Sequence, residues 1–386
     1  MRANSLPARY AGMPVALVCM LFLFPLEKAN GYERSPVVVA EIIRRDLVDC
    51  FEEGLSSGEG QPVYCEASAI AFTGKRLILA SDKPVPGDSH SAVFTFPYPG
   101  HGPIDGPLDY LTADAFISAV KYEDMTITPD GKYIIATTGF DRIKKDSNQW
   151  DGYNTLLFWP VDDPASVKVV ASSNNNGVSS SLGLRGKISK TLLSTEFPDE
   201  VPYFKVESLA AIPGNRLLFG IRELGVRYDK FVYMFKIISV PYEIKNGVLS
   251  LGDFELVYDF DMDRLDAMQQ SVALSSIEYD PFHDRLYLLT SYEIDETDEG
   301  LGGYLWTLSL SALRNEQAPT LVQNNRGDAL QFAHKAEGIT VLSENLVMVI
   351  HDDDRVLGRE LIENPGTQFS RAPHQAAYSL VSLLPQ

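Results

Sequence analysis

Residues 334–355 read HKAEGITVLSENLVMVIHDDDR, and this stretch decides the fold. An acid, Glu337, opens a short apolar run, a polar turn follows at Ser343, Glu344 and Asn345, and a second apolar run ends in more acids. Two such runs joined by a tight polar turn are typical of a β-hairpin. The two charged ends of the hairpin then lie at the same edge of a sheet.

The same unit occurs four more times in the chain. Each copy has a first strand of about five residues, a turn that carries Gly, Asn, Asp or Pro, and a second strand rich in Leu, Ile, Val and Tyr. The further copies are residues 65–83 (CEASAIAFTGKRLILASDK), 122–142 (YEDMTITPDGKYIIATTGFDR), 206–223 (VESLAAIPGNRLLFGIRE) and 275–293 (SSIEYDPFHDRLYLLTSYE).

Repeating units of four short strands, roughly 55–85 residues apart, indicate a β-propeller. We predict an all-β chain with a single propeller over residues 36–386, made of four-stranded antiparallel blades. Five copies favour five blades. Six blades are the alternative if residues 105–120 or 141–205 contain a degenerate copy. Residues 36–48 are expected to form a strand in the blade of residues 377–383, which would close the ring.

Residues 1–29 have the pattern of an export signal. Arg2 and Arg9 are basic, and residues 13–26 form an apolar run of fourteen, which is short for a membrane span. Cleavage is expected near Ala29. The alternatives are an uncleaved anchor and a lipidated Cys19. The prediction is a secreted or periplasmic protein.

Two cysteines, Cys50 and Cys65, follow the signal. Two cysteines in an exported chain favour a disulfide. The bond would join the loop 51–64 to the first strand of the first copy and would stabilise the fold by about 3 kcal/mol. The alternative is two buried thiols.

The formal net charge is −19. A strongly acidic surface disfavours binding to nucleic acid or to an anionic membrane. We expect no nucleic-acid partner, no membrane association after signal removal, and a monomer. The expected partner is a small anionic ester substrate or a ligand of the cell envelope.

The hairpin geometry predicts an acidic rim. In a propeller the first strand of each blade lines the central channel, so its start and the end of the second strand lie at one mouth. The acids at these strand ends would gather at that mouth. Calcium binds six to eight hard oxygens, such as those of carboxylates. Neighbouring lysines would instead make a structural Lys–Glu ring, and this alternative stays open. The predicted metal ligands are Glu66, Glu123, Glu207, Glu337 and Asp352, with Ser275 or Ser276 at the corresponding place in the fourth copy.

Basic residues are predicted at the same rim. A cation flanked by Lys and Arg is suited to a phosphate or carboxylate ester. The alternative is that these side chains form surface ion pairs, which contribute little. The predicted substrate-binding residues are Lys83, Arg222, Lys335 and Arg355.

Two histidines, His334 and His351, flank Glu337 and Asp352 on the rim side of the last copy. They are the candidate catalytic acid and base. The alternative is that they are surface histidines or histidines satisfied within the core.

The unit at residues 66–82 and the strings AEGIT and VMVIHDDDR resemble the calcium-dependent phytase-like propellers. They are especially similar to the exported domain called "esterase-like activity of phytase", and more loosely to SdiA-regulated and gluconolactonase-type propellers. The resemblance implies calcium held by acids at the channel mouth and, in some members, hydrolysis of phosphoric esters. It also implies that Lys335 and Arg355 face an anionic substrate. Serine in the fourth copy departs from a symmetric ring.

The leading hypothesis is therefore an exported, calcium-dependent hydrolase of a phosphate ester or related ester. The alternatives are a non-catalytic binding propeller of the cell envelope and a lactonase-like enzyme with one cation and a carboxylate base. Propellers serve all three purposes, so the fold alone does not choose between them.

Overall fold

The computed structural model describes residues 37–141, 150–175, 177–261, 271–294, 300–361 and 366–385. The predicted export signal at residues 1–29 lies outside this part of the chain. None of the helices in the described ranges has the length and hydropathy that a membrane span requires.

Five antiparallel sheets form five blades. Blade 1 contains β2 (Ala67–Phe72), β3 (Arg76–Ser81), β4 (Val93–Pro97) and β5 (Asp109–Tyr110). Blade 2 contains β6 (Tyr122–Ile127), β7 (Tyr133–Thr138), β8 (Leu156–Pro160) and β9 (Lys168–Val169). Blade 3 contains β12 (Tyr203–Ile212), β13 (Arg216–Arg227), β14 (Lys230–Lys245), β15 (Val248–Leu251) and β16 (Glu255–Asp259).

The other two blades complete the ring. Blade 4 contains β17 (Ala273–Asp280), β18 (Arg285–Glu293), β19 (Leu301–Ser309), β20 (Thr320–Leu321) and β21 (Gln331–Phe332). Blade 5 contains β22 (Ala336–Ser343), β23 (Leu346–His351), β26 (Gln375–Leu383) and β1 (Ala40–Asp49). In blades 3 and 4 two short strands share the outer position, where β15 and β16 both pair with β14, and β20 and β21 both pair with β19.

Helices and two small hairpins lie between the main strands. The helical segments are α1 (Asp114–Ser118), α2 (Trp150–Tyr153), η1 (Pro164–Ser166), α3 (Leu182–Thr191) and α4 (Leu310–Arg314). The small hairpins pair β10 (Ser173–Asn175) with β11 (Val178–Ser180), and β24 (Gly358–Glu360) with β25 (Gln368–Ser370).

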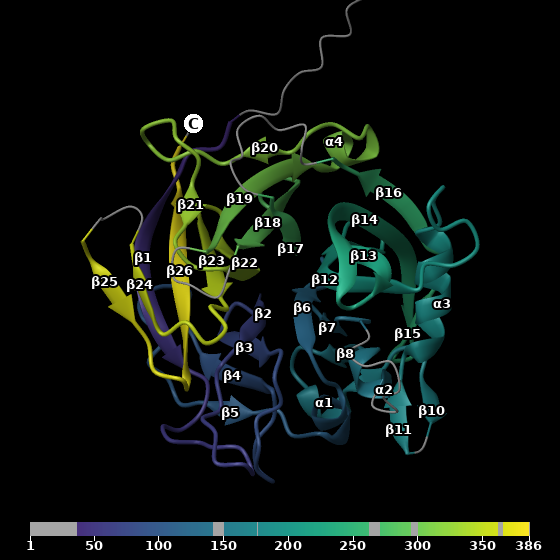
Figure 1. Ribbon diagram of the computed structural model, residues 1–386, viewed down its shortest axis with the longest axis horizontal. Coiled ribbons are helices and arrows are strands. Elements are labelled where there is room, and N and C mark those ends of the chain that lie inside the picture. Colours follow the sequence, from purple (N-terminus) through teal and green to yellow (C-terminus); the bar gives the residue numbers. More distant parts are fainter. Residues whose placement is uncertain are drawn as a thin grey trace, which may run out of the picture. The chain divides into compact units, whose positions relative to one another are not determined.

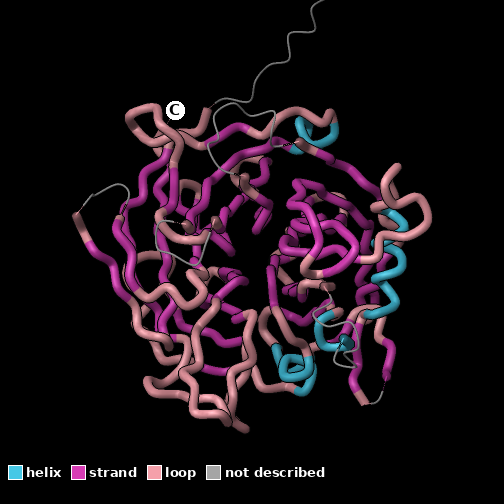
Figure 2. Tube along the Cα trace, in the orientation of Figure 1, coloured by secondary structure: helices cyan, strands magenta, loops and turns pink. Residues whose placement is uncertain are grey.

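The innermost strands β2, β6, β12, β17 and β22 contact one another in turn around the centre, as Figures 1 and 2 show. The prediction of one propeller with five blades is therefore confirmed, and the alternative of six blades is wrong. Strand β1 pairs with β26 from Ala40 opposite Leu383 to Asp49 opposite Gln375, so the predicted closure of the ring is confirmed.

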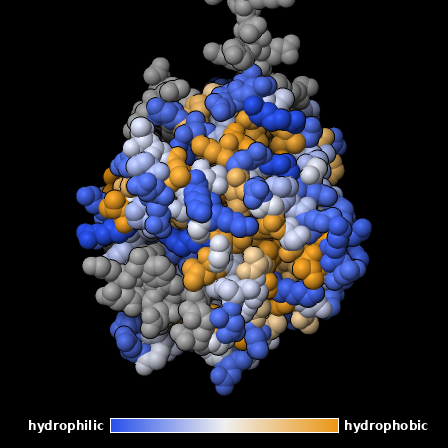
Figure 3. Space-filling model, turned by 90° about the vertical axis from the view of Figure 1, so that its right-hand side faces the viewer, coloured by the Kyte–Doolittle hydropathy of each residue, from blue (hydrophilic) through white to orange (hydrophobic). Residues whose placement is uncertain are grey.

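Hydrophobic side chains lie on both faces of the blades because each blade is covered by two neighbours. Five buried clusters result, one at each interface between adjacent blades. The outer surface is mixed. Figure 3 shows the side that carries α3, where hydrophobic groups lie among hydrophilic ones. Exposed apolar residues include Leu193, just after α3, Val248 in β15 and Leu256 in β16.

Side chains bridge neighbouring inner strands around the axis. Thr340 accepts a hydrogen bond from the amide of Phe72 at 3.1 Å, and Thr126 accepts one from the amide of Ala211 at 3.1 Å. A Cβ added to Gly338 would lie 2.8 Å from the carbonyl oxygen of Ser68, so the strands approach too closely for a larger residue there. The carboxylate of Asp124 in β6 also reaches Ser276 and Ile277 in β17, two blades away, so a ligand is expected at the rim and not within the ring.

Candidate functional site

The predicted rim exists, and its acids are buried. The side chains that the repeat places at the start of each first strand converge at one end of the ring, and contacts link them from blade to blade. The exposed fractions are 5% for Glu66, 3% for Glu123, 3% for Glu207 and 4% for Glu337. Buried carboxylates require cations or hydrogen-bond donors, so the partners of each acid define what the rim does.

Lys205 joins blades 2 and 3. Its Nζ lies 3.2 Å from Oε1 of Glu123 and also contacts Glu207. Lys121 adds a contact of 3.9 Å to Glu123. Burial and the neighbouring Glu207 raise the pKa of Glu123 well above its usual range, although Lys205 opposes this. Burial alone would raise the pKa of Glu207, but Lys205 and Arg222 outweigh it and lower the pKa to about 2.

The guanidinium of Arg222, from the third copy, lies beside Ser275, where the fourth copy has serine in place of the rim glutamate. Its Nη1 donates hydrogen bonds to the hydroxyls of Ser275 at 3.3 Å and Ser291 at 2.9 Å, and its Nε lies 3.7 Å from Glu207. Ser291 donates in turn to Glu337 at 3.4 Å. Arg222 is 4% exposed, so its guanidinium serves the polar side chains of the rim and does not face solvent. Its predicted contact with a substrate stays a prediction, since the guanidinium has its partners within the rim.

Lys335 neutralises acids of blades 4 and 5. Its Nζ lies 3.3 Å from Glu337, 3.4 Å from Asp354 and 3.7 Å from Glu293. Burial raises the pKa of Glu337, and Lys335 opposes the shift. Glu123, Glu207 and Glu337, here called the paired acids, therefore fit the Lys–Glu ring that the sequence left open better than they fit a set of metal ligands.

The remaining acids form a different group. Glu66, Asp82 and Asp352 each place one oxygen within 4.8 Å of the others, and all three are buried. We call them the carboxylate cluster. Glu66 and Asp352 were predicted ligands, whereas Asp82 was expected at the rim but not as a ligand. The side chains come from blades 1 and 5, which meet where the ring closes.

Burial and like charge act on the cluster. Burial, with Asp82 beside it, raises the pKa of Glu66 to about 7. Burial and Asp354 raise the pKa of Asp352 well above its usual range. Burial would also raise the pKa of Asp82, but Lys83 and Lys121 outweigh it and lower the pKa. Carboxylates in this state gain from a cation that neutralises them.

The donor set suits a hard divalent cation. Carboxylate oxygens are the ligands that calcium and magnesium prefer, and water or substrate oxygens complete a shell of roughly six to eight around calcium. The ammonium of Lys83, 2.9 Å from Asp82 and also in contact with Glu66, supplies positive charge at this place. A bound cation would have to share the cluster with Lys83 or displace it toward solvent, and its side chain is already 51% exposed.

A pocket of about 620 Å³ opens beside the cluster. Glu66 belongs to both the cluster and the pocket wall. The other charged side chains in the wall are Lys83, Glu293, Asp354 and Arg355, and the apolar ones are Leu301, Val356 and Leu357. Two of the four predicted substrate-binding residues, Lys83 and Arg355, therefore line a pocket, while Arg222 and Lys335 are engaged within the rim.

Both histidines are buried, each 2% exposed. His334 Nδ1 contacts the carboxylate of Asp353, and His351 Nε2 lies 2.8 Å from the hydroxyl of Ser379. The ring of Phe369, from β25, lies 5.0 Å from the ring of His334. Neither histidine lines the pocket. The geometry favours the alternative of core histidines, although the buried Nε2 of His334 has no hydrogen-bond partner among the described residues, and the catalytic role of the two histidines stays a prediction.

The disulfide between Cys50 and Cys65 is present, with a Cα–Cα distance of 6.1 Å, which confirms the prediction. The loop that it closes contains Gly54, Ser56 and Gly58 in the spacing G-x-S-x-G. A nucleophile elbow needs a turn from a strand into a helix. Ser56 instead lies in a loop where it bridges to Pro62, so this string does not mark a nucleophile.

Glu66→Gln is expected to raise the free energy of unfolding of the chelator-treated protein at pH 8, by about 2–3 kcal/mol. The folded pKa of about 7 lies above the ordinary 4.5, so the native state binds the proton more tightly than the unfolded chain does. Glu66 therefore reduces stability increasingly as the pH rises from about 4.5 to about 7. Urea unfolding at pH 4.5 and pH 8 measures the effect, and an equal change at both pH values would contradict it.

The matched control is Glu207→Gln, which is expected to have the opposite sign. The pKa of Glu207 is lowered to about 2, so the ionised carboxyl stabilises the fold above about pH 4.5 and loses this effect as the pH falls toward 2. The glutamine variant should be less stable than the unaltered protein at pH 7. The difference should shrink in acid.

No family model matches the sequence, and no curated protein matches it. Three solved structures illustrate the structural similarity. A protein of unknown function from Dyadobacter fermentans has 10% identity and a TM-score of 0.42, covering 89% of this chain and 99% of that one. A thermostable family-43 glycoside hydrolase has 9% identity and a TM-score of 0.42, covering 86% and 95%.

The third is the periplasmic gluconolactonase PpgL from Pseudomonas aeruginosa, with 12% identity and a TM-score of 0.36, covering 82% of this chain and 88% of that one. Similarity at this level carries no argument about activity. No phytase-like family is shown, so that part of the resemblance stays a prediction. The β-propeller fold rests on the sheets of the chain itself.

Proposed function

We propose that the protein is an exported, cation-dependent hydrolase of a small anionic ester. The observation that carries the proposal is the position of Glu66, which belongs to both the buried carboxylate cluster and the wall of the adjacent pocket. A cation at the cluster would therefore lie beside the space that a substrate enters. When bound, the cation would polarise an ester oxygen and favour attack by water.

The pocket divides into a charged and an apolar part. Lys83 and Arg355 are suited to an anionic group, and Arg355 also lies with its guanidinium carbon 5.8 Å from the ring centre of Tyr64. Leu301, Val356 and Leu357 are suited to an apolar substituent. The proposed substrate is thus an anionic ester with an apolar group, such as an alkyl or aryl phosphate. It should be preferred over a polyhydroxylated ester.

A lactonase-like reaction is the second candidate, and one observation favours it. Glu66 has a pKa raised to about 7, which places a carboxyl near the optimum for a general base at neutral pH. It could take a proton from the attacking water while Lys83 and Arg355 hold the carbonyl group. The lactone function is uncharged, so this reaction would use the same pocket without an anionic group at the reacting ester.

The proposed compartment is extracellular or periplasmic. The disulfide between Cys50 and Cys65 requires an oxidising environment to form and persist, and this agrees with the predicted export signal. The chain is proposed to be a monomer with its active site at the rim. Neither nucleic acid nor a membrane is proposed as a partner.

The test is calorimetric titration of calcium into chelator-treated protein, with a thermal melt at each concentration. We expect binding and a raised melting temperature, both lost in the double variant Asp82→Asn with Asp352→Asn. The matched control is Glu207→Gln with Glu337→Gln, which neutralises two paired acids and should keep the calcium-dependent rise.

If the unaltered protein binds no calcium up to millimolar concentration, the hydrolase proposal is wrong. The rim would then be structural, and the protein a binding module. If binding occurs, a screen of aryl phosphates, alkyl esters and lactones separates the two reactions. Activity that requires Glu66 and calcium would support either one, and turnover in the Asp82 and Asp352 double variant would contradict both.

A further inference from the structure

The carboxylate cluster is assembled from segments that are far apart in the chain. Glu66 directly follows Cys65 at the start of blade 1, whereas Asp352 directly follows β23 of blade 5. Asp82 is tied to the first segment, since its amide donates to the carbonyl oxygen of Glu66 at 2.8 Å. The spacing of the cluster therefore depends on what holds these two segments together.

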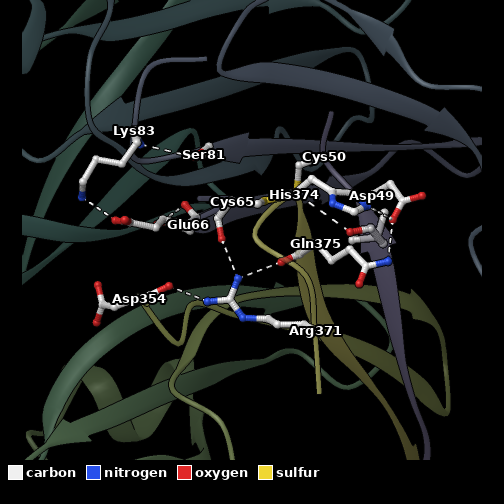
Figure 4. Close-up of a disulfide and its surroundings, with 12 residues drawn as sticks. Asp49, Cys50, Cys65, Glu66, Ser81, Lys83, Asp354, Arg371, His374 and Gln375 are labelled. Carbon is white, nitrogen blue, oxygen red and sulfur yellow. Dashed lines mark hydrogen bonds and ion pairs between the residues drawn. A yellow bond between two sulfur atoms is a disulfide. The ribbon is translucent and has the colours of Figure 1, made fainter. Parts of the chain in front are cut away.

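Arg371 links them directly. Its Nη1 donates to the carbonyl oxygens of Cys65 at 3.4 Å and Gln375 at 2.8 Å, and its Nη2 donates to the carbonyl oxygen of Asp354. The amide of Asp354 donates to the carboxylate of Asp352 at 2.9 Å. Figure 4 shows the guanidinium between the Asp354 side and the Cys65 side.

The disulfide between Cys50 and Cys65 stabilises the same junction of blades 5 and 1. Cys50 directly follows β1, the outer strand of blade 5, and Cys65 lies two residues before β2, the first strand of blade 1. The amide of Cys50 donates to the carbonyl of His374 at 2.9 Å, and the amide of Cys65 donates to that of Pro373 at 2.8 Å. The segment that carries Arg371 is thus held against both cysteines (Figure 4).

Arg371 is 7% exposed, and its Nη1 and Nη2 donate to main-chain carbonyls. Its planar fork reaches several carbonyls at once, which an ammonium does not do in the same way. Its backbone amide also binds the carbonyl of Leu357, a residue of the pocket wall, at 2.8 Å. The residue therefore connects cluster, pocket and disulfide without being a ligand itself.

We propose that Arg371 and the disulfide between Cys50 and Cys65 are positioning groups that set the geometry of the carboxylate cluster and so determine its affinity for a divalent cation. The inference rests on the proposed function, because it assumes that the cluster binds a cation. Groups that orient the ligands of a metal site typically change its affinity by about 10–100-fold when they are removed.

The sign of the effect separates positioning from simple electrostatics. Removing the positive charge of Arg371 near acids should strengthen the binding of a cation if charge alone mattered. Loss of positioning should weaken it. Arg371→Gln is therefore expected to raise the calcium Kd by about tenfold or more. Arg371→Lys, which keeps the charge but not the fork, should weaken binding as well.

The experiment measures the calcium Kd by calorimetry and the melting temperature for Arg371→Gln, Arg371→Lys and the double variant Cys50→Ala with Cys65→Ala. The matched control is Arg285→Gln. Arg285 is a partly buried arginine at a hairpin turn, bound to Asp280 at 3.2 Å and to the hydroxyl of Tyr287 at 2.7 Å. It should lower the melting temperature and leave the Kd unchanged.

Weaker binding in the Arg371 and cysteine variants, with an unchanged Kd in Arg285→Gln, would support the inference. Equal or stronger binding in Arg371→Lys and in the cysteine variant would overturn it and leave the proposed function intact. Absence of calcium binding in the unaltered protein would overturn the proposed function and the inference together. The lysine and cysteine variants keep the test decisive if Arg371→Gln does not fold.

Discussion

Asp124→Ala is expected to lower the free energy of unfolding by about 4 kcal/mol. The carboxylate of Asp124 is fully buried and accepts hydrogen bonds from three blades. The donors are the amide of Leu209 at 2.9 Å, the hydroxyl of Ser276 at 3.0 Å, the amide of Ile277 at 3.4 Å and the amide of Met125 at 2.9 Å. Alanine would leave these buried donors unsatisfied.

Urea denaturation at neutral pH measures this loss. Asp124→Asn keeps the shape but places a donor among donors, so it should be destabilising as well, by about 2 kcal/mol. Asp109→Ala is the matched control, because Asp109 is exposed and has an ion pair with Arg76 that is worth at most about 1 kcal/mol. A cost for Asp124→Ala no larger than that of the control would show that the centre of the ring does not depend on this carboxylate.

Lys205→Met is expected to cost about 3–5 kcal/mol at pH 8. Lys205 bridges Glu123 and Glu207, and methionine would leave two buried carboxylates side by side with less positive charge. The cost should fall as the pH is lowered to 5. Without the lysine, both carboxyls should titrate at higher pH in the native state than in the unfolded chain, so acid favours the native state of the variant.

Paired unfolding curves at pH 5 and pH 8 test this prediction. Lys132→Met provides the control, since Lys132 and its partner Asp130 are 70% and 51% exposed and such pairs contribute about 0–1 kcal/mol. A loss below 1 kcal/mol at pH 8, or one that does not depend on pH, would mean that water or the remaining cations already satisfy the two acids.

The sequence predicts the propeller because its signals are local. Each hairpin is specified by two apolar runs and a turn, and the rim follows from the position of Glu66, Glu123, Glu207 and Glu337 within that unit. The pairing of β1 with β26 was also predictable, since a ring with unpaired ends would expose sheet edges. These features do not require knowledge of how distant side chains meet.

The division of the acids could not be predicted in this way. Whether a rim carboxylate meets a lysine or another carboxylate depends on contacts across blades, such as those of Lys205 with Glu123 or of Asp352 with Glu66. The burial of His334 similarly depends on Phe369, which a separate hairpin brings over it. The spacing within one repeat contains no information about these neighbours.

Asp124 was missed although the repeat contains a signal for it. The residue after each rim position is Ala67, Ser208, Ser276 or Gly338 in the other copies, and only blade 2 has an acid there. A single charged residue among small ones, at a place where the ring is narrow, indicates a buried network and not a solvated side chain.

The pairing of β1 with β26 also has a consequence for how the chain folds. Blades 1 to 4 are each built from consecutive segments, whereas blade 5 needs residues 40–49 and residues 375–383 together. Such a contact has a very high contact order, and its loop-closure entropy must be overcome before any interaction compensates for it. The carboxylate cluster closes a comparable span, since it joins Glu66 and Asp82 of blade 1 to Asp352 of blade 5.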